Sequence, residues 1–277
     1  YFSLPVYLTN TACGLLFAAV FVLLVVLLAS CLNKKKSADT GMPGNESRYV
    51  VLAYVTSWGI STPETSCLTH INYAFGHVAD DNKGIRIDNE PRLQMIVGLK
   101  KEKPSLKVLL SVGGWGSSRF SEMAANDSTR TAFAADCRRV IDKFGLDGID
   151  IDWEYPGSGT AGISFSSADK ENFTLLMRDV RQAVGKDKLL TIATAATGRY
   201  YDFRAIEPYV DYVNIMAYDM EEAPFHHAAL HCSDMTEEWS CEKAVAGHIA
   251  GGFPVQRLVI FGWTPVILLL TSSISSG

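Results

Sequence analysis

Residues 144–156, FGLDGIDIDWEYP, place four carboxylates within eight residues: Asp147, Asp150, Asp152 and Glu154. The rest of this stretch has the apolar character of a buried strand. Because side chains alternate between the two faces of a strand, the last three acids share one face. The other face carries large apolar side chains, which we expect to pack against helices: Ile149, Ile151 and Trp153.

Strands and helices alternate on both sides of this stretch. Short runs rich in β-branched residues predict strands at 49–55, 69–75, 106–112, 146–153, 188–195, 210–217 and 257–261. Helical periodicity is found at 90–103, 128–143 and 169–184, the last with Asp169 as its expected N-cap. The alternation predicts an α/β fold, a (β/α)8 TIM barrel that is incomplete, with about seven strands. A doubly wound sheet is the alternative, but SWGISTPET (57–65) after the first strand lacks a glycine-rich phosphate loop.

Composition narrows the classes of partner. The chain has 277 residues, 48% of them hydrophobic, and a net charge of −5. This balance argues against a nucleic-acid partner and is compatible with a neutral polysaccharide. The six cysteines have no disulfide-framework or CxxC spacing, although Cys232 and Cys241 could bridge in an oxidising compartment.

The shared face of the acids limits their chemistry. Such acids could bind Mg²⁺ or Ca²⁺, or form ion pairs in a core, but a cation site needs oxygen ligands from several loops. Buried carboxylates without partners are too unfavourable to serve as filler. Three acids this close cannot all ionise easily, so at least one should stay protonated near neutral pH. Glu154 is outermost and best placed to donate a proton, as glycosidic bond cleavage requires.

Several motifs resemble those of the chitinase-type glycoside hydrolase family 18, which includes chitinases and endo-β-N-acetylglucosaminidases. DGIDIDWE (147–154) is similar to the family's DxxDxDxE motif at all four acids. SVGGW (111–115) resembles its SxGG motif, and NIMAYDM (214–220) its MxYD segment. AYVTSW (53–58) and INYAFG (71–76) resemble its first two strands, so the similarity covers about residues 49–262.

The resemblance implies a catalytic role for four residues. Glu154 would be the general acid, while the substrate's own acetamido oxygen attacks the anomeric carbon and configuration is retained. Asp152 would orient the acetamido group, and Asp150 would share a proton with Asp152. Tyr218 would bond the acetamido carbonyl.

Further positions follow from the same motifs. Expected substrate contacts are Asp219, Met216, Tyr73, Phe75, Trp115 and Trp58, although the aromatic residues could equally belong to the core. Expected structural residues are Asp147, Ser111, Gly113 and Gly114. The resemblance implies no cofactor and no metal. A metal cluster of His226, His227, His231 and Cys232 is the weaker alternative.

The expected reaction is hydrolysis of β-1,4 bonds next to N-acetylglucosamine, in chitin, chito-oligosaccharides or the chitobiose core of N-glycans. The alternative is a non-catalytic, lectin-like glycan-binding protein. Such relatives usually lose the glutamate at the position of Glu154, so its presence favours the enzyme.

Residues 1–33 are expected to lie outside the catalytic fold. Residues 12–32 form an apolar run that is long enough to span a membrane, and 34–48 resemble a flexible linker. Leu28-Ala29-Ser30-Cys31 resembles a lipobox, which makes Cys31 a candidate for lipidation. An uncleaved membrane anchor and simple secretion are the alternatives. Each predicts an exported protein, membrane-associated in the first two cases.

Residues 263–277 depart from the family pattern. The family would continue after Gly262 into an eighth strand with a tryptophan under the bound sugar, whereas this chain has WTPVILLLTSSISSG. Trp263 directly follows the seventh strand and is not that tryptophan. We expect a truncated barrel with two unpaired edges, for which an inactive relic is a further alternative.

Overall fold

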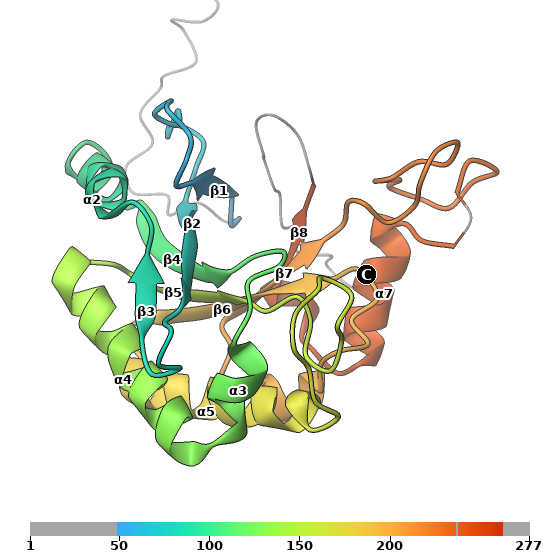
Figure 1. Ribbon diagram of the computed structural model, residues 1–277. Coiled ribbons are helices and arrows are strands. Elements are labelled where there is room, and N and C mark those ends of the chain that lie inside the picture. The colour runs from blue at the N-terminus through green and yellow to red at the C-terminus, as the bar shows by residue number, and fades with distance from the viewer. Residues whose placement is uncertain (1–48, 237, 263–277) are drawn as a thin grey trace, which may run out of the picture. The chain divides into compact units, whose positions relative to one another are not determined.

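Seven parallel strands form one sheet, in which each strand pairs with the next along the chain (Figure 1). The computed structural model describes residues 49–236 and 238–262. The parallel strands are β1 (Leu52–Thr56), β2 (His70–Val78), β4 (Lys107–Gly113), β5 (Gly148–Asp152), β6 (Leu189–Ala195), β7 (Tyr212–Met216) and β8 (Leu258–Phe261). This order confirms the predicted incomplete (β/α)8 barrel, because a doubly wound sheet would reverse direction in the strand order. Among the described strands, β1 and β8 each pair with one neighbour.

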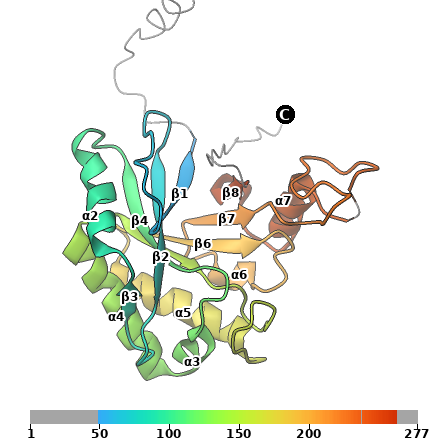
Figure 2. The same cartoon turned by 45° about the horizontal axis from the view of Figure 1, so that its top comes forward.

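Helices connect the strands and cover one face of the sheet (Figures 1 and 2). They are α2 (Glu90–Gly98), α3 (Phe120–Ala125), α4 (Asp127–Phe144), α5 (Asp169–Val184), α6 (Phe203–Ile206) and α7 (Cys241–Ala250). Two 3-10 turns, η1 (Leu99–Lys101) and η2 (Val255–Arg257), adjoin α2 and β8. The short strand β3 (Ile85–Ile87) pairs antiparallel with β2 and was not predicted.

The helix α4 shows why the predicted periodicity produced a helix. Its buried apolar residues recur at steps of three and four, which places them on one face: Phe133, Cys137, Val140, Ile141 and Phe144. The helix ends at Gly145, whose φ of 68° suits glycine and whose N–H bonds the Ile141 carbonyl. After this helix end, the chain continues into β5, which carries the acids.

Asp169 does not have the predicted N-cap role. Ala168 occupies the N-cap of α5, and Asp169 is the first helical residue. Its buried carboxylate accepts hydrogen bonds from the Ser121 hydroxyl at 2.8 Å and from the N–H groups of Ser166 and Gly157 at 2.8 and 3.2 Å. Asp169 therefore fastens the loop that follows β5.

Two apolar clusters occupy the two faces of the sheet. The larger fills the layer between strands and helices, where Trp153 stacks on Phe120 with ring centroids 5.3 Å apart. The smaller lies on the other face and contains Leu52, Ala193, Met216, Val259 and Phe261, with Tyr54, Tyr155 and Tyr218 against it. Apolar side chains of β5 thus face the helices, as alternation predicts.

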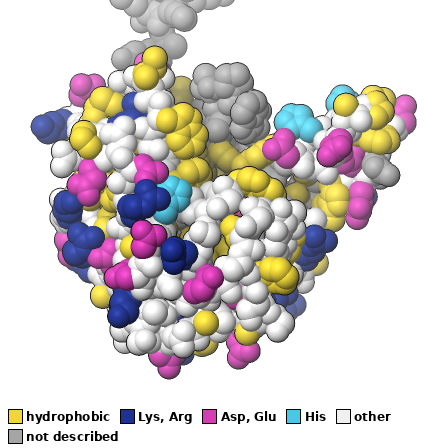
Figure 3. Space-filling model, viewed as in Figure 1, with side chains coloured by type: hydrophobic (Ala, Val, Ile, Leu, Met, Phe, Trp, Pro, Cys, Tyr) yellow, Lys and Arg dark blue, Asp and Glu magenta, His cyan; other side chains and the backbone are white. Residues whose placement is uncertain are grey.

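Some predictions fall outside the described residues. These are the segments 1–33, 34–48 and 263–277, including Cys31 and Trp263. Within residues 49–236 and 238–262, the helices are too short or too polar to span a bilayer. On the face shown in Figure 3, basic and acidic side chains are interspersed.

Candidate active site

The acids of β5 become more exposed along the strand. Asp150 is 0% exposed, Asp152 is 4% exposed and Glu154, just beyond the strand, is 8% exposed. All three lie on the face of the sheet opposite the helices, because their neighbours Ile149, Ile151 and Trp153 pack in the helix layer. The three carboxyl groups therefore form a short column that ends at Glu154.

Asp150 is held by four donors from four strands. Oδ2 accepts from the hydroxyls of Tyr54 and Ser111, each at 2.8 Å. Oδ1 accepts from the Thr191 hydroxyl at 2.5 Å and from Nδ2 of Asn214 at 3.1 Å. Burial raises the pKa of Asp150, and these hydrogen bonds oppose the rise because they favour the ionised form.

Asp152 has a contrasting environment one step along the column. Its Oδ1 atom is buried and has no hydrogen-bond partner among the described residues. Burial raises the pKa of Asp152 well above its ordinary value, and the charges of Glu154 and Asp150 raise it further. Of this pair, Asp150 is thus the better carrier of negative charge and Asp152 the better carrier of a proton.

Glu154 is poised to exchange a proton near neutral pH. Burial raises its pKa from 4.5 to about 7, and a hydrogen bond from the Tyr155 hydroxyl partly opposes the rise. A general acid works best when its pKa lies near the working pH. Glu154 therefore has the electrostatic environment that general acid catalysis needs.

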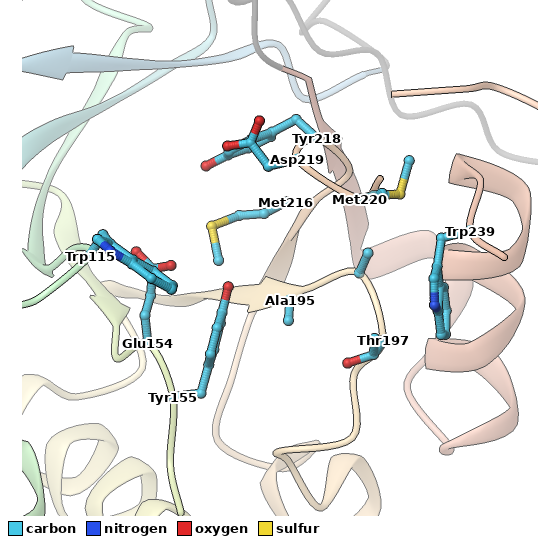
Figure 4. Close-up of a pocket in the computed structure, with 11 residues that line it drawn as sticks. Trp115, Glu154, Tyr155, Ala195, Thr197, Met216, Tyr218, Asp219, Met220 and Trp239 are labelled. Carbon is cyan, nitrogen blue, oxygen red and sulfur yellow. The ribbon is translucent and has the colours of Figure 1, made fainter. Parts of the chain in front are cut away.

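Glu154 opens into a cavity of about 540 Å³ (Figure 4). Trp115 and Glu154 lie at one end in this view, and Thr197 and Trp239 lie toward the other. The wall is mixed aromatic, aliphatic and polar, and consists of Trp115, Glu154, Tyr155, Ala195, Ala196, Thr197, Met216, Tyr218, Asp219, Met220 and Trp239. Aromatic faces combined with a few polar groups are suited to a sugar.

The structure brings several predicted substrate contacts together in this wall. Trp115, Met216, Tyr218 and Asp219 all line the cavity with Glu154. Trp115 is 62% exposed, so its indole face is available to a ligand. Asp219 follows β7 with a φ of 48° and is largely exposed.

Other predicted contacts lie elsewhere. Tyr73 is a correction: it is fully buried in the helix-side core, and its hydroxyl bonds the Asn89 carbonyl at 2.9 Å. Phe75 and Trp58 do not line the cavity with Glu154. Trp58 is 71% exposed on the loop after β1, and Phe75 lies beside Gly114.

The glycine pair at the end of β4 approaches the backbone of β5 closely. Gly113 has a φ of 131°, and a Cβ there would lie 2.0 Å from the Asp152 carbonyl oxygen. Gly114 has a φ of 92°, and its N–H donates to the same oxygen at 2.9 Å. Only glycine fits at this end of β4, where the backbone packs against Asp152 of β5, two residues before Glu154.

Asp147 lies at the other end of β5, away from the cavity. Its carboxylate accepts from the Val108 N–H at 2.8 Å and from Nζ of Lys100 at 2.7 Å. Lys107 lies 3.8 Å from its other oxygen. Asp147 therefore ties the start of β5 to β4 and to the turn η1.

Several site residues were missed by the sequence analysis. Tyr54, Thr191 and Asn214 hold Asp150, and Tyr155, Thr197 and Trp239 line the cavity. Strand pairing could have found Thr191, which is directly opposite Asp150 in the β5–β6 register. No pattern identified Trp239, which lies in the long loop between β7 and α7.

The stretch rich in histidine after β7 does not form a metal cluster in the part of the chain that the structure describes. His231 instead lies 3.0 Å from Glu242, and His227 lies 3.4 Å from Asp219. Cys232 and Cys241 are separate thiols, so the possible bridge between them is not formed.

Comparisons with known proteins identify relatives of this chain. "Probable chitinase 2" of Drosophila melanogaster is 33% identical over 223 residues, which are 71% of this chain and 45% of that protein. "Chitinase A1" of Niallia circulans is 36% identical over 186 residues, 58% of this chain and 27% of that protein. The chain thus spans about half or less of the length of these relatives.

Solved structures give the same result. The chitinase domain of the spore coat protein CotE from Clostridium difficile aligns with a TM-score of 0.73 and 33% identity, over 81% of this chain and 66% of that one. A glycoside hydrolase family 18 N-acetylglucosaminidase from Paenibacillus barengoltzii aligns with a TM-score of 0.71 and 37% identity, over 76% and 67%. The sequence profile of the glycosyl hydrolases family 18 matches residues 50–262, and the chain belongs to that family.

Proposed function

We propose that this chain supplies the catalytic site of a glycosidase that cleaves β-1,4 bonds next to N-acetylglucosamine. One observation carries the proposal. Glu154 has a pKa raised to about 7 and opens into a cavity lined by Trp115, Tyr218 and Asp219. A protonated carboxyl group beside sugar-sized aromatic walls is the arrangement that glycosidic cleavage requires.

In the first step, Glu154 donates its proton to the glycosidic oxygen as the bond from that oxygen to the anomeric carbon breaks. The acetamido oxygen of the same sugar attacks the anomeric carbon from the opposite face and forms an oxazolinium ion. Tyr218 and Asp152 bond the acetamido group and fix its oxygen for attack. Asp150 is fully buried, which is consistent with a mechanism in which it does not act as the nucleophile.

In the second step, ionised Glu154 takes a proton from a water molecule that attacks the anomeric carbon. The oxazolinium ring opens, and the product keeps the starting configuration. The positive charge on the acetamido nitrogen is stabilised by the single negative charge of the Asp150–Asp152 pair, whose two carboxyl groups share one proton. The four donors to Asp150 support this role, because they allow Asp150 to hold the charge while Asp152 holds the proton.

The substrate class we propose is chitin, chito-oligosaccharides or the chitobiose core of N-glycans. The names of the chitinase relatives support the first two, and the N-acetylglucosaminidase structure supports the shared acetamido chemistry. The cavity itself favours a ligand that has apolar faces and no negative charge, since its wall contains aromatic side chains and two carboxyl groups but no basic side chain.

The test is Glu154→Gln in the full chain, assayed on chito-oligosaccharides and on an N-glycan chitobiose substrate. We expect kcat to fall by at least about 10²-fold, the typical contribution of a general acid, while the Kd for chito-oligosaccharides changes little. Unchanged turnover would overturn the mechanism. Binding by the wild type with no hydrolysis of either substrate would instead favour the lectin-like alternative.

We also propose that the protein is exported and held at a membrane through residues 1–33. The apolar run at 12–32 and the lipobox-like Leu28–Cys31 support this proposal. Metabolic labelling with palmitate tests it, with Cys31→Ser as the variant and Cys13→Ser as the control. Label that only Cys31→Ser removes indicates a lipoprotein, and unlabelled protein in the membrane fraction indicates an anchor. Recovery of the chain in the cytoplasm would overturn both.

A further inference from the structure

Two consecutive tyrosines of the loop after β6 contact the residues on either side of Glu154. Tyr201 contacts Trp153, which precedes Glu154, and Tyr200 contacts Tyr155, which follows it. Neither Tyr200 nor Tyr201 lines the cavity itself.

Tyr201 acts on the backbone before Glu154. Its hydroxyl lies 3.3 Å from the Trp153 carbonyl oxygen and 3.3 Å from the Ala193 carbonyl oxygen. The residue is buried, and its ring packs edge-on against Phe173 at 5.1 Å. One buried hydroxyl therefore links the end of β5 to β6 at the peptide unit that carries Glu154.

Tyr200 acts on the side chain after Glu154. Its ring is parallel to that of Tyr155 within 3°, with centroids 4.6 Å apart. The guanidinium group of Arg199 lies 4.8 Å from the Tyr200 ring centroid and donates to its hydroxyl at 2.7 Å. Stacked rings of this kind contribute about 0.5–1.5 kcal/mol beyond their burial, so Tyr200 restricts the orientation of Tyr155.

The loop that carries both tyrosines is itself anchored. Gly198 has a φ of 62°, and its N–H donates to the Ala195 carbonyl at 3.0 Å. Lys170 donates to the Arg199 carbonyl at 3.1 Å, which ties the loop to α5. The loop is thus fixed at its start and its middle and can act as a rigid support.

We propose that Tyr200 and Tyr201 are positioning residues for the general acid Glu154. This inference rests on the function proposed above. Tyr201 fixes the main chain on one side of the acid, and Tyr200 fixes the ring of Tyr155 on the other side. Without Tyr200, the Tyr155 ring gains freedom and its interaction with Glu154 weakens.

Several titratable groups face Glu154 and bear on the measurement of its pKa. Asp152 and Asp150 lie on β5, Tyr155 adjoins Glu154, and Tyr218 and Asp219 line the same cavity from the segment after β7. The hydrogen bond from Tyr155 lowers the pKa of Glu154, whereas burial raises it. Weakening that bond should therefore raise the pKa of Glu154 and move it away from neutral pH.

The experiment compares Tyr200→Leu, which removes the stacking ring, with Tyr200→Phe, which keeps it. Tyr209→Leu is the matched control, because Tyr209 is a half-buried tyrosine near the opposite ends of the strands. We expect Tyr200→Leu to lower kcat by about 10-fold with KM nearly unchanged, and Tyr200→Phe to retain most activity. Tyr201→Phe, which removes only the hydroxyl, should lower kcat by a smaller factor.

Carboxyl ¹³C NMR titration of Glu154, assigned with Glu154→Gln, is independent of turnover. We expect the pKa of Glu154 to rise in Tyr200→Leu but not in Tyr200→Phe or Tyr209→Leu. A rise in a protein that hydrolyses nothing supports the positioning role and overturns the proposed function. Normal hydrolysis with an unshifted Glu154 in Tyr200→Leu overturns the positioning role and leaves the proposed function intact.

Discussion

The hydroxyl of Tyr54 in β1 lies 2.8 Å from Oδ2 of Asp150 in β5, and the two residues are 96 positions apart in the chain. The strands that carry them are not neighbours in the sheet. The bond therefore spans the concave face of the open barrel. It supplies one of the four donors that favour ionised Asp150 over protonated Asp150.

Tyr54→Phe is predicted to lower kcat because the proton moves from Asp152 toward Asp150. Hydrogen bonds to charged groups contribute about 1.5–3 kcal/mol, so we expect a decrease of about 10-fold or more. Tyr212→Phe is the control, since Tyr212 lies near the start of β7 and no bond from its hydroxyl to the acids is present. Steady-state kinetics on chito-oligosaccharides checks the prediction, and equal kcat values for Tyr54→Phe and the wild type would contradict it.

The pH profile should reflect Glu154. Because the general acid must be protonated, we expect the rate to fall as pH rises through about 7. Tyr155→Phe removes the hydrogen bond that lowers this pKa, so its descending limb should move to higher pH. Initial rates from pH 4 to 10 measure both midpoints. If the descending limb of the Tyr155→Phe profile moved to lower pH, the role of Tyr155 as the donor that lowers the pKa of Glu154 would be contradicted.

Glu154 should also make folding depend on pH. Its folded pKa of about 7 lies above the ordinary value of 4.5, so the folded state binds the proton more tightly than the unfolded state. This contribution is fully present below about pH 4.5 and is lost as pH rises through about 7. Glu154→Gln removes this pH dependence. Relative to the wild type, the variant should gain on the order of 2 kcal/mol more free energy of unfolding at pH 8 than at pH 4. Urea unfolding of the wild type and of Glu154→Gln at the two pH values checks this. The prediction would be contradicted if the two proteins differed in free energy of unfolding by the same amount at both pH values.

Gly113→Ala is predicted to destabilise the close packing of the end of β4 against Asp152 of β5. The added Cβ would lie 2.0 Å from the Asp152 carbonyl oxygen, at a φ of 131° that alanine rarely adopts. We expect a loss of at least about 2 kcal/mol in the free energy of unfolding. Gly98→Ala is the matched control, because a Cβ at this position of α2 meets nothing within 4 Å and alanine favours helix. Urea denaturation compares the two, and equal stabilities would refute the close approach.

Two features could be predicted from the sequence alone: the open barrel and the face of β5 that carries the acids. Strand and helix alternation predicted the open barrel, and the parity of β5 separated its acids from Ile149, Ile151 and Trp153. The same parity rule also accounts for the error at Tyr73. Tyr54 faces Asp150 and is paired in register with Asn72, so the next residue, Tyr73, must face the helices.

Two partners of Asp150, Tyr54 and Asn214, could not be predicted because they depend on the curvature of the sheet. Tyr54 and Asn214 are 160 positions apart, yet Nδ2 of Asn214 lies 3.2 Å from the Tyr54 hydroxyl. Local periodicity indicates which face a side chain occupies but not which strands converge on that face. The loop residues Tyr200 and Trp239 were missed for a related reason, because irregular segments have no period that predicts their direction.

Trp239 is predicted to bind a sugar unit at the end of the cavity away from Trp115 (Figure 4). The loop that carries Trp239 is fixed by Glu221, whose Oε1 accepts hydrogen bonds from the backbone N–H groups of Trp239 at 2.7 Å and of Glu238 at 2.5 Å. Ser240, the next residue, is buried and caps α7. The indole is therefore held in place by contacts that do not involve its ring.

Trp239→Ala should weaken binding of longer chito-oligosaccharides by about 10-fold, the loss typical of one aromatic contact, and affect the disaccharide much less. Phe165→Ala is the control, since Phe165 is an exposed aromatic that does not line this cavity. Calorimetry in the Glu154→Gln background isolates binding from turnover. The length dependence is the decisive feature, because a general loss of folding would weaken all oligomers equally, and equal affinities for Trp239→Ala and its parent would exclude a sugar contact at this end.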